Sequence, residues 1–386
     1  MSGMTAKSSF PQPVGFSVEY FDPVADLLRT FVLTVFPDQK VQMVRGNKTF
    51  LSKTYAKDLE TTDLYIGGTI VLCSRELSIV DYADESTRKY FEGLQSRSFV
   101  MVLPTAMGSL GEIISIVQDG GAGCDSNGRN PSVMSNAKMF RSDGRRGRSE
   151  LSALEDALPQ SGVAVALEII ADSRHGGFDG LLGVVDGLRR RHGSGFFASS
   201  TPTEALEHAR HIFQEEAEES AKQANKPRDN NDGACTLCVV KPHVVRDGKL
   251  GAVLSFVAQK GFEVAGLQML YVGEVGAEEL LRPYRGVVSY HADAVRHLKS
   301  GPCVALKIQA RRTEYSLSRE NVVEEFREAC GPADPEVAKA LYPDSLRALL
   351  GVGQATNAVH CTDLPEDGLL ECQYMFDVVA NGRQGA

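Results

Sequence analysis

The stretch that decides the fold is LCVVKPHVV at residues 237–245, because FVMVLPTAM at residues 99–107 repeats its pattern. Each is an apolar, strand-like run that stops at a proline, Pro242 in one and Pro104 in the other. Proline interrupts the hydrogen bonding of a strand and often opens a helix. Both stretches therefore predict a strand followed by a helix.

The repetition extends beyond these two strands. SGVAVALEI at 161–169 matches SGPCVALKI at 300–308, and the distance from proline to serine is 57 residues in the first copy and 58 in the second. Between them, apolar residues recur at i, i+3, i+4 and i+7, as in a helix packed on a sheet. The two sets are Leu110, Ile113, Ile114, Val117 and Leu250, Val253, Leu254, Val257. The sequence thus predicts a duplicated α/β module.

Two shifts of composition divide the rest of the chain. Residues 14–91 alternate in strand fashion between turn signals such as RGNK and IGG, which predicts a small, mostly-β domain. Residues 214–233 are charged and almost lack large apolar side chains, which favours the end of an acidic helix followed by a linker. The predicted boundaries are 1–91 for the β domain, 92–215 and 234–378 for the two modules, 216–233 for the linker and 379–386 for a tail.

Composition and charge exclude several classes of function. The net charge of −9 argues against nucleic acid or an anionic membrane as the main partner, since both need a basic face. No apolar run reaches membrane-spanning length. The eight cysteines do not have the spacing of a disulfide framework, which predicts reduced thiols in an intracellular protein. CTLC at 235–238 is half a zinc motif, but residues three apart on a strand face opposite ways, so two core residues are the favoured interpretation.

The candidate chemistry lies in the second copy, around NAVHCTD at residues 357–363. His360 ends a short apolar run, Lys241 ends the first strand of this copy, and Glu371 lies eleven residues after the histidine. Lysine donates charge-assisted hydrogen bonds to phosphate oxygens, and a neutral histidine oriented by a carboxylate can act as a nucleophile. This set suits phosphoryl transfer. A hydrogen-bonded structural histidine and a solvated strand-end lysine are the alternatives that the pattern leaves open.

The second copy resembles the nucleoside diphosphate kinase family over about residues 234–378. TLCVVKPHVV is similar to that family's first strand with its phosphate-contacting lysine, and NAVHCTD is similar to its Asn-x-x-His-Gly-Ser-Asp segment. The resemblance implies that His360 takes the γ-phosphate of a nucleoside triphosphate and passes it to a diphosphate, with Glu371 orienting the imidazole. It also implies Mg²⁺ bound with ATP as the cofactor. The implied nucleotide-binding residues are Lys241, Tyr284, Tyr290, Arg327, Arg347, Asn357 and Thr362.

Several positions of the second copy depart from the family's pattern. His243 stands at an Asp, Cys361 at the Gly after the catalytic His, Cys330 at a phosphate-binding Thr, and Glu324 at a phosphate-binding Arg, with Arg327 three places on as a substitute. Each lost donor removes a charge-assisted hydrogen bond worth about 1.5 to 3 kcal/mol. At most a weak kinase is therefore expected.

The first copy has lost the chemistry. Sixteen residues before Phe213 stands Phe197, whereas sixteen residues before Phe376 stands His360. Leu103 takes the position of the lysine, and about 24 residues around the phosphate loop are missing. We expect an inactive module that keeps its fold.

The order of the parts resembles one group of the family, the homologue 7 group. EYFDPVADLLRTFVLTVFP at 19–37 and DLYIGGTIVLCSRELSIVDYAD at 63–84 are similar to the DM-ten domain of ciliary proteins. The expected fold is α+β, with a small β-barrel-like (PH-like) domain before two ferredoxin-like βαββαβ modules that carry helices on one face of the sheet. The resemblance implies a structural microtubule-associated protein of the cytoplasm and cytoskeleton, inside the doublet microtubules of a cilium or flagellum axoneme. The implied partners are tubulin, other axonemal inner proteins and the γ-tubulin complex.

Three functions stay open from the sequence: a structural inner protein of microtubules, a weak kinase using His360, and a sensor that binds nucleotide without turnover. The stretch 128–148 carries six Lys or Arg against one Asp. Such an insertion suits the acidic surface of tubulin, and a solvated loop is the alternative.

Overall fold

The computed structural model describes residues 12–22, 27–56, 59, 64–66, 69–73, 75–118, 132–142, 162–172, 177–215, 234–311 and 321–380. The chain divides into two compact units. The first comprises residues 1–96 with 172–174, and the second comprises residues 97–171 with 175–386. Among the described residues, no helix combines the length and hydropathy that a membrane span requires.

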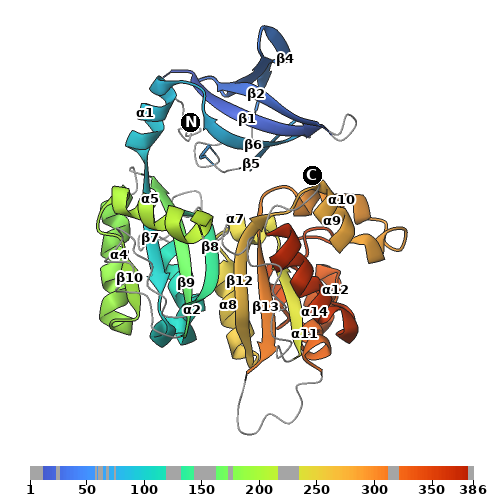
Figure 1. The fold of residues 1–386 in the computed structure, drawn as a ribbon. Helices are drawn as coiled ribbons and strands as arrows, with labels where there is room; N and C mark the ends of the chain where they lie inside the picture. Colours follow the sequence, from blue (N-terminus) through green and yellow to red (C-terminus); the bar gives the residue numbers. More distant parts are fainter. Residues whose placement is uncertain are drawn as a thin grey trace, which may run out of the picture. The chain divides into compact units, whose positions relative to one another are not determined.

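In its described residues, the first unit is a six-stranded antiparallel sheet with one helix (Figure 1). Its elements are β1 (Val14–Asp22), β2 (Leu27–Val35), β3 (Lys40–Arg45), β4 (Lys48–Tyr55), β5 (Thr69–Leu72), β6 (Arg75–Tyr82) and α1 (Glu85–Leu94). Alternate apolar side chains such as Phe16 and Leu33 form the core together with Phe91 of α1. A small, mostly-β domain is thus confirmed. Its described strands form an open sheet with edges at β4 and β5, in place of a closed barrel.

The second unit is built on one eight-stranded sheet in the order β10-β7-β9-β8-β12-β13-β11-β14. The strands are β7 (Gln95–Val102), β8 (Ser132–Ser142), β9 (Gly162–Asp172), β10 (Phe196–Ala198), β11 (Cys235–Val240), β12 (Phe262–Tyr271), β13 (Pro302–Ala310) and β14 (Val359–Cys361). From the central β8–β12 pair outward, both halves place their own second, third, first and fourth strands in the same sequence. This is the strand order of a ferredoxin-like βαββαβ unit. The two copies detected in the sequence therefore share a topology.

Helices cover both faces of this sheet, which corrects the prediction of helices on one face. They are α2 (Leu110–Gln118), α4 (Gly177–His192), α5 (Pro202–Arg210), α7 (Pro242–Arg246), α8 (Leu250–Gln259), α9 (Glu274–Leu280), α10 (His291–Leu298), α11 (Val322–Cys330), α12 (Pro335–Leu341), α13 (Leu346–Leu350) and α14 (Gly368–Gln373), with short helical turns η2 (Pro104–Ser109), η4 (His211–Glu215), η5 (Arg282–Tyr284), η6 (Pro365–Asp367) and η7 (Tyr374–Val379).

Strand β11 shows why both faces need cover. All six of its residues are buried. Cys238 and Val240 belong to the core that includes α8 and α11, whereas Cys235 and Leu237 belong to the core that includes α9, α10 and α14. A strand that is apolar on both sides must be covered on both sides. The two cysteines of CTLC thus point into different cores, which confirms their interpretation as core residues.

Helices α2 and α8 lie side by side and join the two halves of the second unit (Figure 1). A Cβ built on Gly251 would lie 2.2 Å from Ser115 Oγ and 2.5 Å from the Gly111 carbonyl oxygen. A Cβ on Gly111 would lie 2.4 Å from Ser255 Oγ. Each helix thus offers a glycine and, four residues later, a serine to the other. Only glycine permits such a close approach, and the two halves share one hydrophobic core.

Several predicted segments need correction or lie outside the described residues. The linker 216–233 and the outer parts of the basic stretch 128–148 lie outside them. The middle of that stretch is not a loop insertion, because residues 132–142 form β8 and pair with β9. Buried Met134 and Ala137 anchor this strand. Between β9 and β10 the described helix is α4, whereas α11, α12 and α13 lie between β13 and β14.

Candidate active site

The candidate site is built at β14, a short edge strand that carries His360. The chain enters it through a γ-turn at Ala358, whose φ is 71°, and the Val359 amide donates to the Asn357 carbonyl at 2.9 Å. A positive φ at a residue other than glycine is strained, and such strain gathers at functional sites. The Lys241 amide donates to the Ala358 carbonyl at 2.9 Å, which holds the turn against the end of β11.

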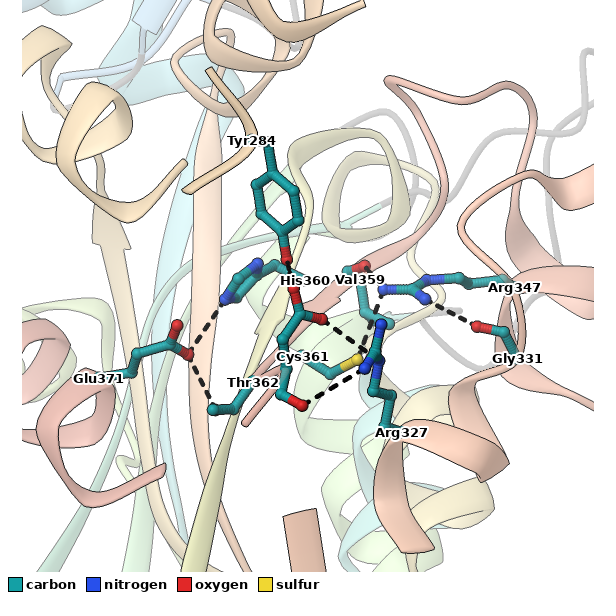
Figure 2. A network of polar contacts seen from close by, with 10 residues as sticks. Tyr284, Arg327, Gly331, Arg347, Val359, His360, Cys361, Thr362 and Glu371 are labelled. Atoms are coloured by element: carbon teal, nitrogen blue, oxygen red, sulfur yellow. Dashed lines mark hydrogen bonds and ion pairs between the residues drawn. The ribbon is translucent and has the colours of Figure 1, made fainter. Parts of the chain in front are cut away.

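Figure 2 shows His360 with the residues around it, among them Glu371 and Thr362. His360 Nε2 lies 3.2 Å from Glu371 Oε2, and the Thr362 hydroxyl donates to the same oxygen at 2.8 Å. The hydroxyl also accepts from the Leu237 amide at 3.1 Å, so its direction is fixed. Burial alone would raise the pKa of Glu371, but the hydrogen bonds from His360 and Thr362 lower it below its ordinary value. A charged carboxylate therefore faces Nε2, which leaves Nδ1 as the nitrogen whose lone pair can attack.

Asp363, the residue after Thr362, pairs with two predicted site residues, Tyr284 and Arg327. The Tyr284 hydroxyl donates to Asp363 Oδ2 at 2.5 Å, and the Tyr284 ring stands edge-on to His360 with centroids 6.4 Å apart. Arg327 Nε pairs with Asp363 Oδ1 at 3.3 Å. Burial and the bond to Asp363 raise the pKa of Tyr284, so its phenol stays protonated.

Arg347 is directed into the protein. Its guanidinium donates to the Gly331 carbonyl at 2.7 Å, to the Val359 carbonyl at 3.2 Å and to Cys361 Sγ at 3.4 Å (Figure 2). The residue is 8% exposed. Most of the hydrogen bonds that this side chain can donate are therefore used to hold α13 against the end of α11 and against β14.

Lys241 and Asn357 are also directed towards the backbone. Lys241 Nζ donates to the Ala355 carbonyl and Asn357 Nδ2 donates to the Ala333 carbonyl, both at 2.9 Å. Burial, with a smaller contribution from the Arg347 cation, lowers the pKa of Lys241 to about 7. Near neutral pH this amine therefore carries only part of the positive charge that a phosphate would meet.

His243, which replaces an aspartate of the family pattern, pairs with His297 of α10. Their Nδ1 and Nε2 atoms lie 2.8 Å apart. Burial lowers the pKa of His243 to about 4, and burial together with the neighbouring His243 lowers the pKa of His297 to about 3. Both rings are neutral at pH 7, so His243 supplies no charge to the site.

The first half of the sheet places Phe197 at the position of His360. In β14, His360 pairs with the residue two places before Lys241. In β10, Phe197 pairs with the residue two places before Leu103. The two positions therefore have the same register in the two halves. An aromatic ring stands where the second half has its imidazole.

The neighbours of Phe197 follow the same register. Ser199 and His208 stand two and eleven residues after it, the offsets at which Thr362 and Glu371 follow the histidine of the second half. Ser199 Oγ lies 2.7 Å from His208 Nδ1, the counterpart of the 2.8 Å bond in the second half. Both residues are buried. The sequence analysis missed them, although counting the same offsets from Phe197 would have found them.

The structure brings most predicted site residues together. His360 and Thr362 both contact Glu371, and the Tyr284 ring lies beside His360. Tyr284 and Arg327 both pair with Asp363, which follows Thr362 and which sequence reasoning had not singled out. The side chains of Lys241, Arg347 and Asn357 donate to backbone carbonyls instead. Tyr290 lies apart. It precedes α10, is half-buried against the core of α9 and α10, and has no described contact with the others.

Two buried polar atoms of the predicted nucleotide-binding residues have no partner among the described residues. They are Arg347 Nε, a donor, and Asn357 Oδ1, an acceptor. Buried polar atoms are almost always paired, and a phosphate oxygen and a sugar hydroxyl would complete this donor and this acceptor. The residues present thus fit a nucleotide. Within the described ranges, His, Cys, Asp and Glu nowhere gather in threes that could ligate a metal.

The chain is similar in sequence to several known proteins. The family model for nucleoside diphosphate kinase matches residues 234–380. Nucleoside diphosphate kinase homolog 7 of Rattus norvegicus is 35% identical over 382 residues, which cover 95% of this chain and 93% of that protein. The nucleoside diphosphate kinase of Aquifex aeolicus is 31% identical over 141 residues, 36% of this chain and 92% of that enzyme. A crystal structure of an Aquifex aeolicus nucleoside diphosphate kinase matches 37% of this chain and 94% of its own with a TM-score of 0.33.

Proposed function

The chain belongs to the nucleoside diphosphate kinase family, and we propose that it is a structural, microtubule-associated member of that family in the axoneme of a cilium or flagellum. Its partners would be tubulin of the doublet microtubule, other axonemal inner proteins and the γ-tubulin complex. Its compartment would be the cytoplasm and cytoskeleton. The resemblance of its N-terminal residues to the DM-ten domain of ciliary proteins supports this proposal.

The observation that carries the proposal is Phe197 at the register position of His360. The half of the sheet around Phe197 keeps the strand order of the other half, although it lacks an imidazole at this point. Phe197 packs against Phe99 and His208, with ring centroids 6.4 and 5.3 Å away. This half therefore acts as a degenerate kinase module that offers folded surfaces and no turnover.

The second half supports the same conclusion through its phosphate donors. Lys241 and Arg347 already donate to backbone carbonyls, and the pKa of Lys241 is lowered to about 7 by burial. A donor that must first leave a buried carbonyl contributes less to binding a phosphate, because the carbonyl then loses its partner. The site is better arranged for stability than for rapid phosphoryl transfer.

Co-sedimentation with assembled microtubules tests the structural function. The purified full chain should enter the pellet with microtubules, and His360→Ala should bind as well as the wild type because the proposed role needs no phosphohistidine. If the chain stays in the supernatant and transfers phosphate at the rate of an ordinary member of the family, the proposal is wrong.

A second function is favoured by the contacts of His360, namely weak nucleoside diphosphate kinase or histidine autokinase activity in the second module. Glu371 fixes Nε2, so Nδ1 would attack the γ-phosphorus, and the bond from that phosphorus to the diphosphate would break. The imidazole becomes cationic as its bond to phosphorus forms, and the carboxylate of Glu371 stabilises this charge. The phosphoryl group would then pass from Nδ1 to a second diphosphate.

Magnesium would take part in this second function together with the nucleotide. Mg²⁺ prefers oxygen ligands and often binds substrate phosphates with few protein ligands. Asp363 and Glu371 are already engaged by neighbouring donors, so phosphate oxygens and water would supply most of its shell. Its chemistry would be to neutralise charge on the phosphates.

Labelled ATP separates the two functions. A kinase would acquire acid-labile label on the wild type and on the control His211→Ala, but not on His360→Ala. The label would then move to an added nucleoside diphosphate. Stabilisation against heat by nucleotide, without label, identifies a site that binds without turnover. The absence of both excludes the second function.

A further inference from the structure

The hairpin of β3 and β4 in the first unit is a basic part of an acidic chain. We name residues 38–55 the basic hairpin. This stretch contains Lys40, Arg45, Lys48 and Lys53 against the single acidic residue Asp38. Four positive charges and one negative charge leave +3, whereas the whole chain carries −9. A local excess of positive charge attracts partners of the opposite sign.

Strand β4 presents much of this charge to solvent. It lies at an edge of the described sheet (Figure 1), and seven of its eight residues are exposed, while Leu51 is half-buried. The neighbouring strand β3 buries Val41 and Met43 in the core of the first unit. The core therefore holds the hairpin in place through β3, and the side chains of β4 stay accessible to a partner.

The turn end of the basic hairpin brings two cations together. Arg45 and Lys48 lie directly opposite each other in the pairing of β3 with β4, and both are exposed. Neither has an acidic partner among the described residues. Like charges in directly opposed positions destabilise a sheet. This pair thus costs the fold stability, and a bound carboxylate would relieve the repulsion.

The other end of the basic hairpin has one carboxylate for two cations. Lys40 Nζ lies 2.8 Å and Lys53 Nζ lies 3.7 Å from the same oxygen of Asp38. The ring of Phe50, which is 44% exposed, has its centroid 5.3 Å from the guanidinium carbon of Arg75. A partner would therefore meet an excess of cations together with an exposed aromatic ring.

We propose that the basic hairpin docks an extended acidic segment of a partner protein. Lys48 and Lys53 are five residues apart on β4, which is about 16 Å along a strand. Side chains on one side of an extended peptide repeat about every 7 Å, so a segment of about six to eight residues would carry three carboxylates past both lysines. This inference goes beyond the microtubule role proposed above and does not depend on it.

Charge also decides between this partner and others. Nucleic acid and anionic membranes are extended polyanions, and they would meet the acidic remainder of the chain as well as the hairpin. Lysines on an edge strand repel the same strand of a second copy, whereas an acidic segment neutralises them. The basic hairpin is thus arranged for a short segment of opposite charge.

The test titrates the full chain into a fluorescently labelled octaglutamate peptide at low ionic strength and follows the anisotropy. The double variant Arg45→Gln/Lys48→Gln should bind about tenfold more weakly, because each lost surface ion pair contributes a few-fold. The matched control Arg88→Gln/Lys89→Gln removes the same charge from α1 of the same unit, where both cations already have acidic partners. It should bind like the wild type. Added salt should weaken the binding, and an octaglutamine peptide should not bind.

Two measurements separate docking from folding. Arg45→Gln/Lys48→Gln should unfold at the same urea concentration as the wild type or at a higher one, because the substitutions remove a repulsion. Hydrogen exchange of the wild type should slow within residues 40–55 when octaglutamate is added, and this readout needs no variant.

Several results would overturn the proposal. They are no binding of octaglutamate by the wild type, equal losses in the two double variants, binding of octaglutamine, and protection of a different segment. Tighter binding to phosphatidylserine vesicles than to octaglutamate would assign the hairpin to a membrane instead. A loss of stability in Arg45→Gln/Lys48→Gln would show that the two cations serve the fold. None of these readouts depends on microtubules or on phosphotransfer, so the outcome is independent of the proposed function.

Discussion

Replacing Arg347 with methionine tests whether this buried cation maintains the fold. The guanidinium donates to the carbonyls of Gly331 and Val359 at 2.7 and 3.2 Å, and it joins α13 to the end of α11 and to β14. Methionine has a similar unbranched stem and no donors. In the variant, both carbonyls stay buried and lose their charged partner.

The magnitude follows from these two carbonyls. A buried acceptor left without its donor costs about 1 to 3 kcal/mol, so two cost about 2 to 6 kcal/mol. The variant also avoids burying a charge, which offsets part of this cost. We expect a net loss of about 3 kcal/mol, which is roughly a 10²-fold rise in the population of the locally open state. Arg327→Met is the matched control, because the Arg327 side chain is 51% exposed and surface ion pairs contribute about 0 to 1 kcal/mol.

Hydrogen exchange of the full chain measures this opening directly, on peptides within residues 322–361. In Arg347→Met these peptides should exchange about 10²-fold faster, while peptides from residues 27–56 of the first unit keep their wild-type rates. If Arg347→Met exchanged like the wild type and lost only nucleotide affinity, then Arg347 would be a ligand-binding residue without a structural role. The argument from its captured donors would then fail.

Three further predictions concern the helix crossing, the buried lysine and the catalytic carboxylate. Gly251→Ala should lower the free energy of unfolding, measured by urea titration, by about 1 to 3 kcal/mol, since its Cβ would meet backbone of α2. Gly183→Ala, with open space around its Cβ, should be neutral or stabilising. Equal effects of the two substitutions would contradict the close crossing. Burial lowers the pKa of Lys241 from 10.5 to about 7. Between these two values the unfolded chain binds more protons than the folded chain, so the free energy of unfolding should rise from pH 7 towards pH 10. Below pH 7 the lysine is protonated in both states and causes no further change with pH. Lys241→Met should flatten this rise in urea titrations, and equal slopes would refute the shift. Glu371→Gln should reduce acid-labile labelling of His360 by about tenfold or more, because an amide stabilises the imidazolium poorly; unchanged labelling would show that Glu371 does not act on His360.

The duplicated architecture could be predicted because the repeat keeps its register. Pro104 and Pro242 end equivalent strands, and each opens a helical turn. The count of sixteen residues assigned Phe197 to the position in the first half that His360 has in the second. The strand pairing in both halves agrees with this assignment. Insertions change the lengths of loops. A shift of one residue in strand pairing, however, would turn the apolar side chains of the strand to the opposite face of the sheet.

The direction of the buried donors could not be predicted. A sequence identifies Lys241 and Arg347 as donors, but their acceptors are carbonyls of Ala355 and Gly331, in loops whose path depends on the packing of α12 and α13. The sequence analysis also failed to predict that helices cover both faces of the sheet, for a related reason. The strand β11 is apolar at every position, and such a run indicates burial without telling which helices provide it.

The two halves together indicate which part of the site is structural. The bond between Ser199 and His208 joins β10 to α5, and the bond between Thr362 and Glu371 joins β14 to α14. This contact, common to both halves, attaches the edge strand to the helix that follows it, and it persists where the nucleophile is absent. Burial lowers the pKa of His208, so a neutral imidazole stands where the second half has the carboxylate of Glu371. Phe197 forms no cation, so its half of the sheet needs no negative charge beside it. The carboxylate in the second half is therefore the feature that the fold does not require, and its presence next to His360 is the strongest structural reason to look for phosphohistidine in this protein.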